Sequence, residues 1–378
     1  MTLISGAEAA ALDREAAADW GLSPCALVEA AGRACAEALY PVLAARRFSR
    51  LLVLAGSGNH GADALVMLRA LLVRRGGLFS DVGVLLSKLP DENGETGKTP
   101  RAQAVLALRK MGVAVRAWNA ADAESLRRPA ALIIDGIAGT GISGPLGGTA
   151  LDMLNAANAA RETAGVVSID IPSGASDDWK PGYPVVSCDC CLAVEPLKAC
   201  LYTPSLRSRA GDIIPVTGIF PPALTAEYAG RSARELRGWT EAAARVPPVP
   251  AGAYKYRRGV VESRAGSAGS TGAARIAAAG AGAAGAGLVR LGVDESIYPL
   301  LAANAGGVMV YPASQNPDFA RPRFKPDAIL LGPGWGREAA RRPVRDKALE
   351  AEASGVPLVL DADAIALAAD CVFSGSTI

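Results

Sequence analysis

Histidine is almost absent from this 378-residue sequence, since His60 is the only one. A catalytic triad of serine, histidine and aspartate would have to use that residue, and a metal site with several histidines cannot form. The sequence therefore argues against zinc-dependent hydrolysis. His60 lies in a glycine-rich segment at a strand end, where a ligand-facing role and a structural role are both open.

A large excess of charge of either sign is also missing, because 39 Lys and Arg residues stand against 37 Asp and Glu residues. Nucleic acids and anionic membranes attract strongly basic proteins, so we expect neither as a partner and favour a small-molecule ligand. The longest apolar stretch, residues 276–289, is shorter than the roughly 18 residues of a membrane span. The first residues lack the features of a secretory signal, so we expect a cytoplasmic protein.

Disulfide bonds are not expected, because the seven cysteines are an odd number in a chain without an export signal. Cys188, Cys190 and Cys191 are close together, with Cys200 beyond them, which could indicate zinc. Structural zinc, however, usually takes cysteine pairs spaced as C-x₂₋₄-C. In an apolar run, C-x-C-C points alternate side chains to opposite faces of a strand. We therefore favour a buried strand.

Short apolar runs alternate with helix-prone segments through the first two thirds of the sequence. Such runs are typical of parallel strands that are covered on both faces. They lie near residues 51–55, 82–86, 131–134, 166–169 and 190–194. The pattern predicts an α/β fold with a doubly wound sheet, that is, a three-layer αβα domain of the Rossmann-like kind.

The length predicts two domains, and the proline-rich stretch 245–250 marks the boundary between them. We predict a first domain over residues 1–236, a linker over 237–253 and a second α/β domain over 254–378. The second domain shows a strand, a Gly/Ala-rich helix and two more apolar runs, in that order.

A glycine-rich segment, residues 56–61, follows the first strand and precedes a helix. Its sequence Gly-Ser-Gly-Asn-His-Gly fits the G-x-G-x-x-G fingerprint of dinucleotide-binding proteins in the required context. The acidic residue that usually holds ribose is absent, because Ser87 and Lys88 stand there, so an ordinary nicotinamide dehydrogenase is disfavoured. Glycines that serve only a tight turn stay an alternative. Residues 94–99 resemble the end of a P-loop but lack its first glycine, so we expect a solvated loop.

Two further loops at strand ends carry candidate chemistry. Asp135 is followed by the Gly-Thr-Gly turn 139–141, whose amides can surround an anion. Asp170 is followed three residues later by the hydroxyl of Ser173. Ligands of open α/β sheets bind at such strand ends, although a plain turn or a helix cap would also explain these residues.

Together these segments resemble the bifunctional NAD(P)H-hydrate repair enzymes, which have an N-terminal epimerase domain and a C-terminal dehydratase domain. The resemblance extends over nearly the whole chain, and several short segments carry it. They are 27–33, 56–64, 135–141, 170–174 and Lys198 in the first part, and 266–267, 271–274, 285–289, 332–336 and 361–364 in the second.

The resemblance implies a Rossmann-like domain followed by a partial ribokinase-like domain. In this family the epimerase interconverts the C6 epimers of hydrated NADH or NADPH, and the dehydratase removes water from the S form using ADP or ATP. The substrate-binding positions would be Asn59, His60, Gly61, Ala62, Asp63, Gly139, Thr140, Gly141, Asp170 and Lys198. Asp170 would be the acid/base group. A potassium ion would lie on His60, Asp135 and Ser173, and the dehydratase candidates would be Ala273, Gly334 and Asp361.

The sequence departs from the family loop G-x-G-N-N-G-G-D-G at three positions. His60 replaces the second Asn, and imidazole nitrogen suits potassium less well than an amide oxygen. Ala62 and Ala64 replace glycines and add methyl groups where the backbone could need a positive φ or a close approach. In the second domain, Tyr256 replaces a glycine, and Glu262 and Arg264 place charges in a buried strand, which is costly unless they are paired.

The chain ends soon after residues 361–364, before the segments that hold nucleotide phosphates in the family, so we expect no autonomous dehydratase activity and an exposed sheet edge. We expect a homo-oligomer. Our first hypothesis is an NAD(P)H-hydrate epimerase, with ADP or ATP relevant only to a complete dehydratase domain. A binding-only relative and a nicotinamide oxidoreductase are the alternatives.

Overall fold

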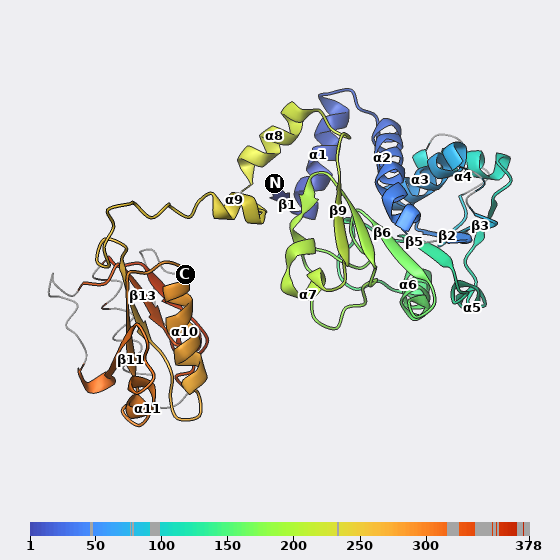
Figure 1. Ribbon diagram of the computed structural model, residues 1–378. Coiled ribbons are helices and arrows are strands. Elements are labelled where there is room, and N and C mark those ends of the chain that lie inside the picture. Colours follow the sequence, from blue (N-terminus) through green and yellow to red (C-terminus); the bar gives the residue numbers. More distant parts are fainter. Residues whose placement is uncertain are drawn as a thin grey trace. The chain divides into compact units, whose positions relative to one another are not determined.

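The computed structural model describes residues 1–45, 48–75, 77, 79–90, 99–232, 234–315, 325–336, 350, 353, 355–368 and 373. The chain divides into two compact units, Met1–Ala242 and Ala243–Ile378, and the division falls inside the stretch 237–253 that the sequence marks as a linker (Figure 1). Of the P-loop-like stretch 94–99, residues 94–98 lie outside the described residues. Among the described helices, none is long and apolar enough to span a bilayer.

The first unit is built on a seven-stranded, fully parallel sheet in the order β4-β3-β2-β5-β6-β7-β9. Its strands are β2 (Arg50–Ala55), β3 (Asp81–Leu86), β4 (Ala114–Ala117), β5 (Ala131–Gly136), β6 (Gly165–Ile169), β7 (Cys190–Val194) and β9 (Asp212–Val216). The sequence predicts five of them. It does not single out β4 and β9, which form the two edges and are less apolar than the central strands.

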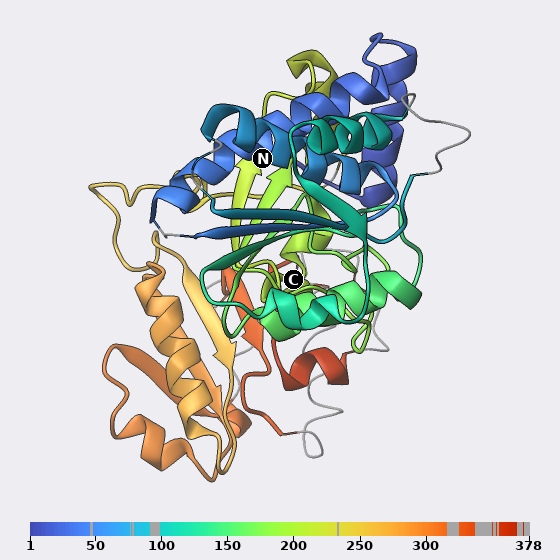
Figure 2. The ribbon, with the colours of Figure 1, turned by 90° about the vertical axis from the view of Figure 1, so that its right-hand side faces the viewer.

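Helices cover both faces of this sheet (Figures 1 and 2). One layer contains α1 (Gly6–Ala18), α2 (Pro24–Ala45), α3 (Asn59–Arg75), α4 (Pro100–Lys110) and α8 (Pro222–Arg231). The other contains α5 (Asp122–Leu126), α6 (Gly148–Ala160), η2 (Ala199–Tyr202) and α7 (Pro204–Arg207). The side chains of Cys190 and Cys191 enter the two different cores, as the C-x-C-C pattern predicts for a strand. The predicted three-layer αβα fold is confirmed.

The strand order reverses between β2 and β5. From β2 the chain adds β3 and β4 on one side, whereas β5, β6, β7 and β9 extend the other side. At such a switch point the loops after the two central strands diverge to opposite faces of the sheet and leave a crevice at the strand ends. The loops that follow Ala55 and Gly136 are therefore placed where open α/β sheets bind ligands.

The N-terminal segment of the chain is held next to this crevice by strand pairing. Strand β1 (Leu3–Ile4) pairs in parallel with β8 (Leu197–Lys198), so that Ile4 lies opposite Lys198. Helix α1 follows at once and starts with a capping box, in which the side chains of Ser5 and Glu8 each bond the other's backbone N–H.

The second unit holds a five-stranded parallel sheet in the order β12-β11-β10-β13-β14. Its strands are β10 (Val260–Arg264), β11 (Leu288–Val293), β12 (Val308–Pro312), β13 (Ala328–Leu331) and β14 (Leu358–Leu360). Its helices are α10 (Thr271–Ala283), α11 (Tyr298–Ala302), η3 (Ala313–Gln315) and α13 (Asp363–Leu367), while α9 (Trp239–Ala243) precedes the unit.

The charges in the buried strand β10 are paired. Glu262 is fully buried, and its carboxylate lies 3.2 Å from Nε of Arg264 and 2.8 Å from Nε of Arg290. The Arg264 guanidinium also stacks on the ring of Tyr311. Burial raises the pKa of Glu262 to about 7, although both arginines oppose that shift. The pairing offsets part of the desolvation cost that the sequence indicates.

Candidate active site

The loops after β5 and β6 are joined by a buried hydrogen-bond network centred on Asp135. Its Oδ2 accepts hydrogen bonds from the Ser168 hydroxyl at 2.8 Å and from the Ser173 backbone N–H at 2.9 Å. Its Oδ1 accepts from the Ser173 hydroxyl at 2.5 Å and from the Ile137 N–H at 3.3 Å. The hydroxyl oxygen of Ser173 in turn accepts from the N–H of Ala138. Asp135 therefore fixes both loops relative to each other.

Asp170 stands at the end of β6 with a backbone φ of +60°. Positive φ is uncommon outside glycine and costs free energy, although aspartate tolerates it better than most residues. The residue is held there by its N–H, which donates to the Leu192 carbonyl at 2.8 Å, and by its carboxylate, which accepts from Lys198 Nζ at 2.6 Å. The strained backbone position is thus that of the residue for which the family resemblance implies the acid/base role.

The glycine loop after β2 packs against the loop after β5 at distances that exclude side chains. A methyl group on Gly56 would lie 1.8 Å from the Ile137 carbonyl oxygen, and one on Gly61 would lie 2.4 Å from the Gly56 carbonyl oxygen. At Gly139 a methyl group would meet the His60 ring at 2.8 Å. Neither Gly56 nor Gly61 has a positive φ, so close approach is what requires glycine here.

The two alanines that replace family glycines lie on α3, and neither has a positive φ. Ala62 and Ala64 are both fully buried, and the methyl group of Ala64 packs against Gly136. The expectation that these positions could need a left-handed backbone is therefore wrong for this chain. Within a helix, alanine is in fact more favourable than glycine.

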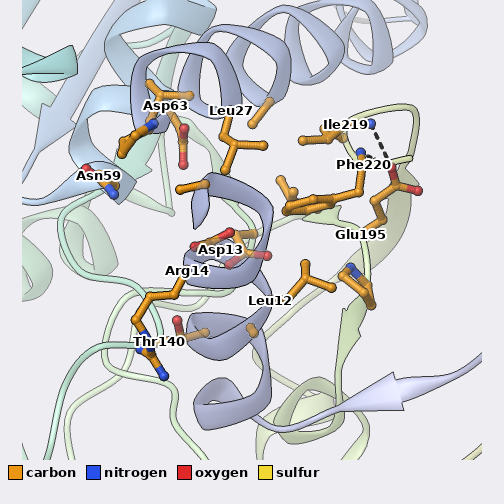
Figure 3. Close-up of a pocket in the computed structure, with 18 of the residues that line it drawn as sticks. Leu12, Asp13, Arg14, Leu27, Asn59, Asp63, Thr140, Glu195, Ile219 and Phe220 are labelled. Atoms are coloured by element: carbon orange, nitrogen blue, oxygen red, sulfur yellow. Dashed lines mark hydrogen bonds between the residues drawn. The ribbon is translucent and has the colours of Figure 1, made fainter. Parts of the chain in front are cut away.

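A cavity of about 280 Å³ opens beside these loops (Figure 3). Five of the predicted substrate residues line it: Asn59, Asp63, Thr140, Asp170 and Lys198. The other predicted residues of this unit do not: His60, Gly61, Ala62, Asp135, Gly139, Gly141 and Ser173. The network of Asp135 and Ser173 is buried and does not line the cavity, whereas Asp170 does.

The sequence analysis gives no site role to the rest of the cavity wall, although Leu27 belongs to the segment 27–33 that carries the resemblance. Helix α1 supplies Leu12, Asp13 and Arg14, and an apolar side is formed by Leu27 of α2 and by Phe220 (Figure 3). The S-x-x-E pattern at residues 5–8 signals a helix start, but only the tertiary structure shows that this helix closes the site.

The charged groups of the cavity interact strongly. Burial raises the pKa of Asp63 well above its ordinary value, and the charges of Asp170 and Asp13 add to the effect while Lys198 opposes it. Partial desolvation in the cavity also raises the pKa of Asp13, whose side chain stays partly exposed to solvent; Lys198 and Arg14 oppose this shift and Asp170 adds to it. Three carboxyl groups thus share one buried ammonium group, which favours a protonated form at Asp63 and Asp13.

His60 does not line this cavity, and its ring packs against Gly139. Burial lowers its pKa, against the opposing charges of Asp135 and Asp170. Its Nε2 is buried and has no hydrogen-bond partner among the described residues. Among those residues no three His, Cys, Asp or Glu side chains gather as for a transition metal.

The three candidates of the second unit lie in neighbouring segments: Ala273 in the first turn of α10, Gly334 after β13 and Asp361 after β14. Gly334 has a φ of +68°, and a methyl group there would meet the Ala273 methyl carbon at 2.7 Å. A methyl group on Gly332 would lie 2.0 Å from the Asp361 carbonyl oxygen. The Ser267 hydroxyl donates to the Gly334 carbonyl at 2.8 Å. The loops after β10, β13 and β14 therefore contact one another, as the loops after β2, β5 and β6 do in the first unit.

Fold and site together define a two-unit α/β protein with a nucleotide-type crevice in its first unit. Residues 24–200 match the family described as YjeF-related protein N-terminus, and residues 264–376 match the family described as NAD(P)H-hydrate dehydratase. A yeast protein of known crystal structure, 23% identical, covers 64% of this chain and 98% of its own length with a TM-score of 0.52, which agrees with the fold.

Curated relatives extend over both units. The bifunctional NAD(P)H-hydrate repair enzyme of Salinibacter ruber is 30% identical over 96% of this chain and 69% of its own length. The enzyme of the same name from Moorella thermoacetica is 29% identical over 98% of this chain and 70% of its own length. The chain belongs to the family of bifunctional NAD(P)H-hydrate repair enzymes.

Proposed function

We propose that the first unit interconverts the R and S epimers of hydrated NADH and NADPH, and so repairs damaged cofactor. The observation that carries this proposal is the position of Asp170. An ion-paired, backbone-strained carboxylate lines a cavity that also borders the glycine loop and the Gly-Thr-Gly turn. Family membership supplies the substrate class, and the cavity supplies groups that suit it.

The cavity matches the two ends of such a substrate. Thr140, in the Gly-Thr-Gly turn, lies where that turn can offer polar groups to phosphate, and Asn59 and Asp63 at the start of α3 hold the polar parts of the hydrate. Leu27 and Phe220 form an apolar wall against which the hydrated ring packs. The Phe220 loop is fixed, because Glu195 Oε1 accepts hydrogen bonds from three successive backbone N–H groups of that loop.

The chemistry requires proton transfer at the carbon that bears the hydroxyl. The C6–O bond breaks with both electrons on oxygen, which takes a proton and leaves as water, while the lone pair of the ring nitrogen N1 stabilises the resulting cation. Water then adds to the other face of C6 and gives up a proton. Asp170 is in place to exchange one of these protons, and Lys198 stabilises its carboxylate form.

We also propose a potassium ion at His60, Asp135 and Ser173. The side-chain oxygens of Asp135 and Ser173 lie together there, and His60 Nε2 is a buried polar atom without a hydrogen-bond partner in the part of the chain that the structure describes, so these residues fit a cation. The ion would supply positive charge beside the substrate phosphates and would stiffen the loops around them. For the second unit, we propose that Ala273, Gly334 and Asp361 mark the binding region for ADP or ATP.

The test is incubation of the protein with the separate R and S hydrates of NADPH, followed by chromatography of both epimers. Interconversion in H₂¹⁸O with label entering at C6 is the expected result, because the hydroxyl leaves as water and returns from solvent. Binding without interconversion would instead make the chain a binding-only relative, and reduction or oxidation of the ring would indicate an oxidoreductase. The expected homo-oligomer and cytoplasmic location stay predictions, which sedimentation and cell fractionation would check.

A further inference from the structure

Helix α1 closes one side of the epimerase cavity and brings a carboxyl group into it. Asp13 lines the cavity together with Asp63 and Asp170, and Figure 3 shows it on α1, in the space between Asp63 and Leu12. The match to the YjeF-related family begins at residue 24, so α1 lies ahead of it. Neither the sequence motifs nor the family match gives Asp13 a role.

Asp13 is held in place by the fold. Strand β1 pairs with β8, which carries Lys198, and the first N–H of α1, that of Gly6, donates to Asp177 Oδ2 at 2.6 Å. Leu12 and Ala16 of the same helix are buried in the core of the first unit. The Tyr228 hydroxyl donates to Glu15 Oε2 at 3.0 Å. Four contacts along its length thus fix the helix.

The surroundings of Asp13 and Asp170 differ. The Asp170 carboxylate accepts a hydrogen bond from the buried Lys198 ammonium group. The Asp13 carboxyl has no hydrogen bond or ion pair to any residue that the structure describes. Around it stand Asp63 of α3, Asp170 after β6, Lys198 of β8 and Arg14 of its own helix. An ion-paired carboxylate and a carboxyl group without such a partner among the described residues, lining one cavity, are suited to act as base and acid.

We propose that Asp13 is the second acid/base group of the epimerase, acting with Asp170 on the two faces of the substrate carbon. In one direction Asp13 gives its proton to the departing hydroxyl, the C6–O bond breaks and water leaves. A second water adds to the opposite face, and the Asp170 carboxylate takes the proton that it releases. One proton has then passed from Asp13 to Asp170. The reverse reaction returns it, and between turnovers in the same direction Asp170 gives its proton to solvent water while Asp13 takes one up. This inference rests on the proposed epimerase function.

The experiment compares Asp13→Asn, Asp13→Glu and Asp19→Asn with the wild type, using both purified epimers of hydrated NADPH over a range of pH. Asp19 is exposed just after the last residue of α1, so its substitution is a matched control for the same chemical change on the same helix. Binding of each epimer is measured separately, and thermal unfolding reports whether each variant is folded.

The expected result for Asp13→Asn is a loss of about 100-fold or more in kcat, with binding largely kept. The loss in kcat/KM must be equal in the two directions, because the equilibrium between the epimers does not change. Asp13→Glu regains a large part of the rate. In the wild type, activity falls at the alkaline side as Asp13 loses its proton, and in Asp13→Asn that fall disappears. The double variant Asp13→Asn/Asp170→Asn is hardly slower than the slower single variant.

Three outcomes would overturn the role of Asp13. The first is a rate in Asp13→Asn within about 3-fold of that of Asp19→Asn. The second is a loss of binding that accounts for the whole effect. The third is an unchanged alkaline limb in Asp13→Asn, which would leave Asp63 as the remaining carboxyl with a raised pKa. A wild-type protein without epimerisation would overturn the proposed function itself and the role of Asp13 with it.

Discussion

The ammonium nitrogen of Lys198 lies 2.6 Å from Oδ1 of Asp170, and only 5% of the lysine side chain is exposed to solvent. The same ammonium group donates to the Val194 carbonyl at 3.0 Å. A buried ion pair of this kind contributes little net stability compared with apolar residues, but breaking it leaves an uncompensated charge. We therefore attribute the position of this ion pair at the cavity to the reaction rather than to the stability of the fold.

Substitution Asp170→Asn keeps the shape of the side chain and removes its ability to exchange a proton. We expect kcat for epimerisation to fall by about 100-fold or more while binding of the hydrate is largely kept. Chromatographic rates and equilibrium binding measure the two effects. Asp152→Asn, on the exposed side of α6, serves as the control. Unchanged activity in Asp170→Asn would remove this residue from the mechanism.

Substitution Lys198→Met leaves the Asp170 carboxylate without its ionic partner. We expect the free energy of unfolding to fall by about 3 kcal/mol, the lower end of the range for breaking a buried pair. The double variant Lys198→Met/Asp170→Asn should recover part of that loss, because it carries no unpaired charge. Urea unfolding at pH 7 measures both. A single variant as stable as the wild type would contradict this account of the pair.

Asp63 should reduce stability at neutral pH. Its pKa in the folded protein is raised above the ordinary value of 3.8. The unfolded chain therefore releases its proton more readily, and stability is lost as the pH rises from about 3.8 through the raised value. We expect Asp63→Asn to be more stable than the wild type at pH 7, by on the order of 1 kcal/mol, and equally stable near pH 3. Urea unfolding at several pH values tests this, and a difference independent of pH would contradict it.

Potassium should bind and increase activity. We expect a higher epimerisation rate and a higher midpoint of thermal unfolding in potassium chloride than in tetramethylammonium chloride at equal ionic strength. Substitution His60→Asn supplies an amide oxygen and should lower the potassium concentration needed for both effects. Equal rates and midpoints in the two salts would exclude a functional potassium site, while the unfolding measurement separates ion binding from catalysis.

The sequence by itself determined the fold class and the strand-end positions of Asp135 and Asp170, because short apolar runs, glycines and strand-terminal carboxylates are local signals. It also determined that charges in β10 need partners. It could not show that Arg290, 28 residues after Glu262, is one of these partners. Nor could it show that the segments of β4 and β9 are strands, because edge strands have weaker apolar patterns.

Only the tertiary structure decided which candidates face one cavity. Asn59, Asp63, Thr140, Asp170 and Lys198 line it, whereas Asp135 and Ser173 do not line it and hydrogen-bond to each other. The physical reason is that which side chains face the cavity depends on how distant segments pair, as β1 pairs with β8. The same pairing brings Asp13 from an unremarked N-terminal helix to a site built mostly from residues more than 40 positions later in the chain.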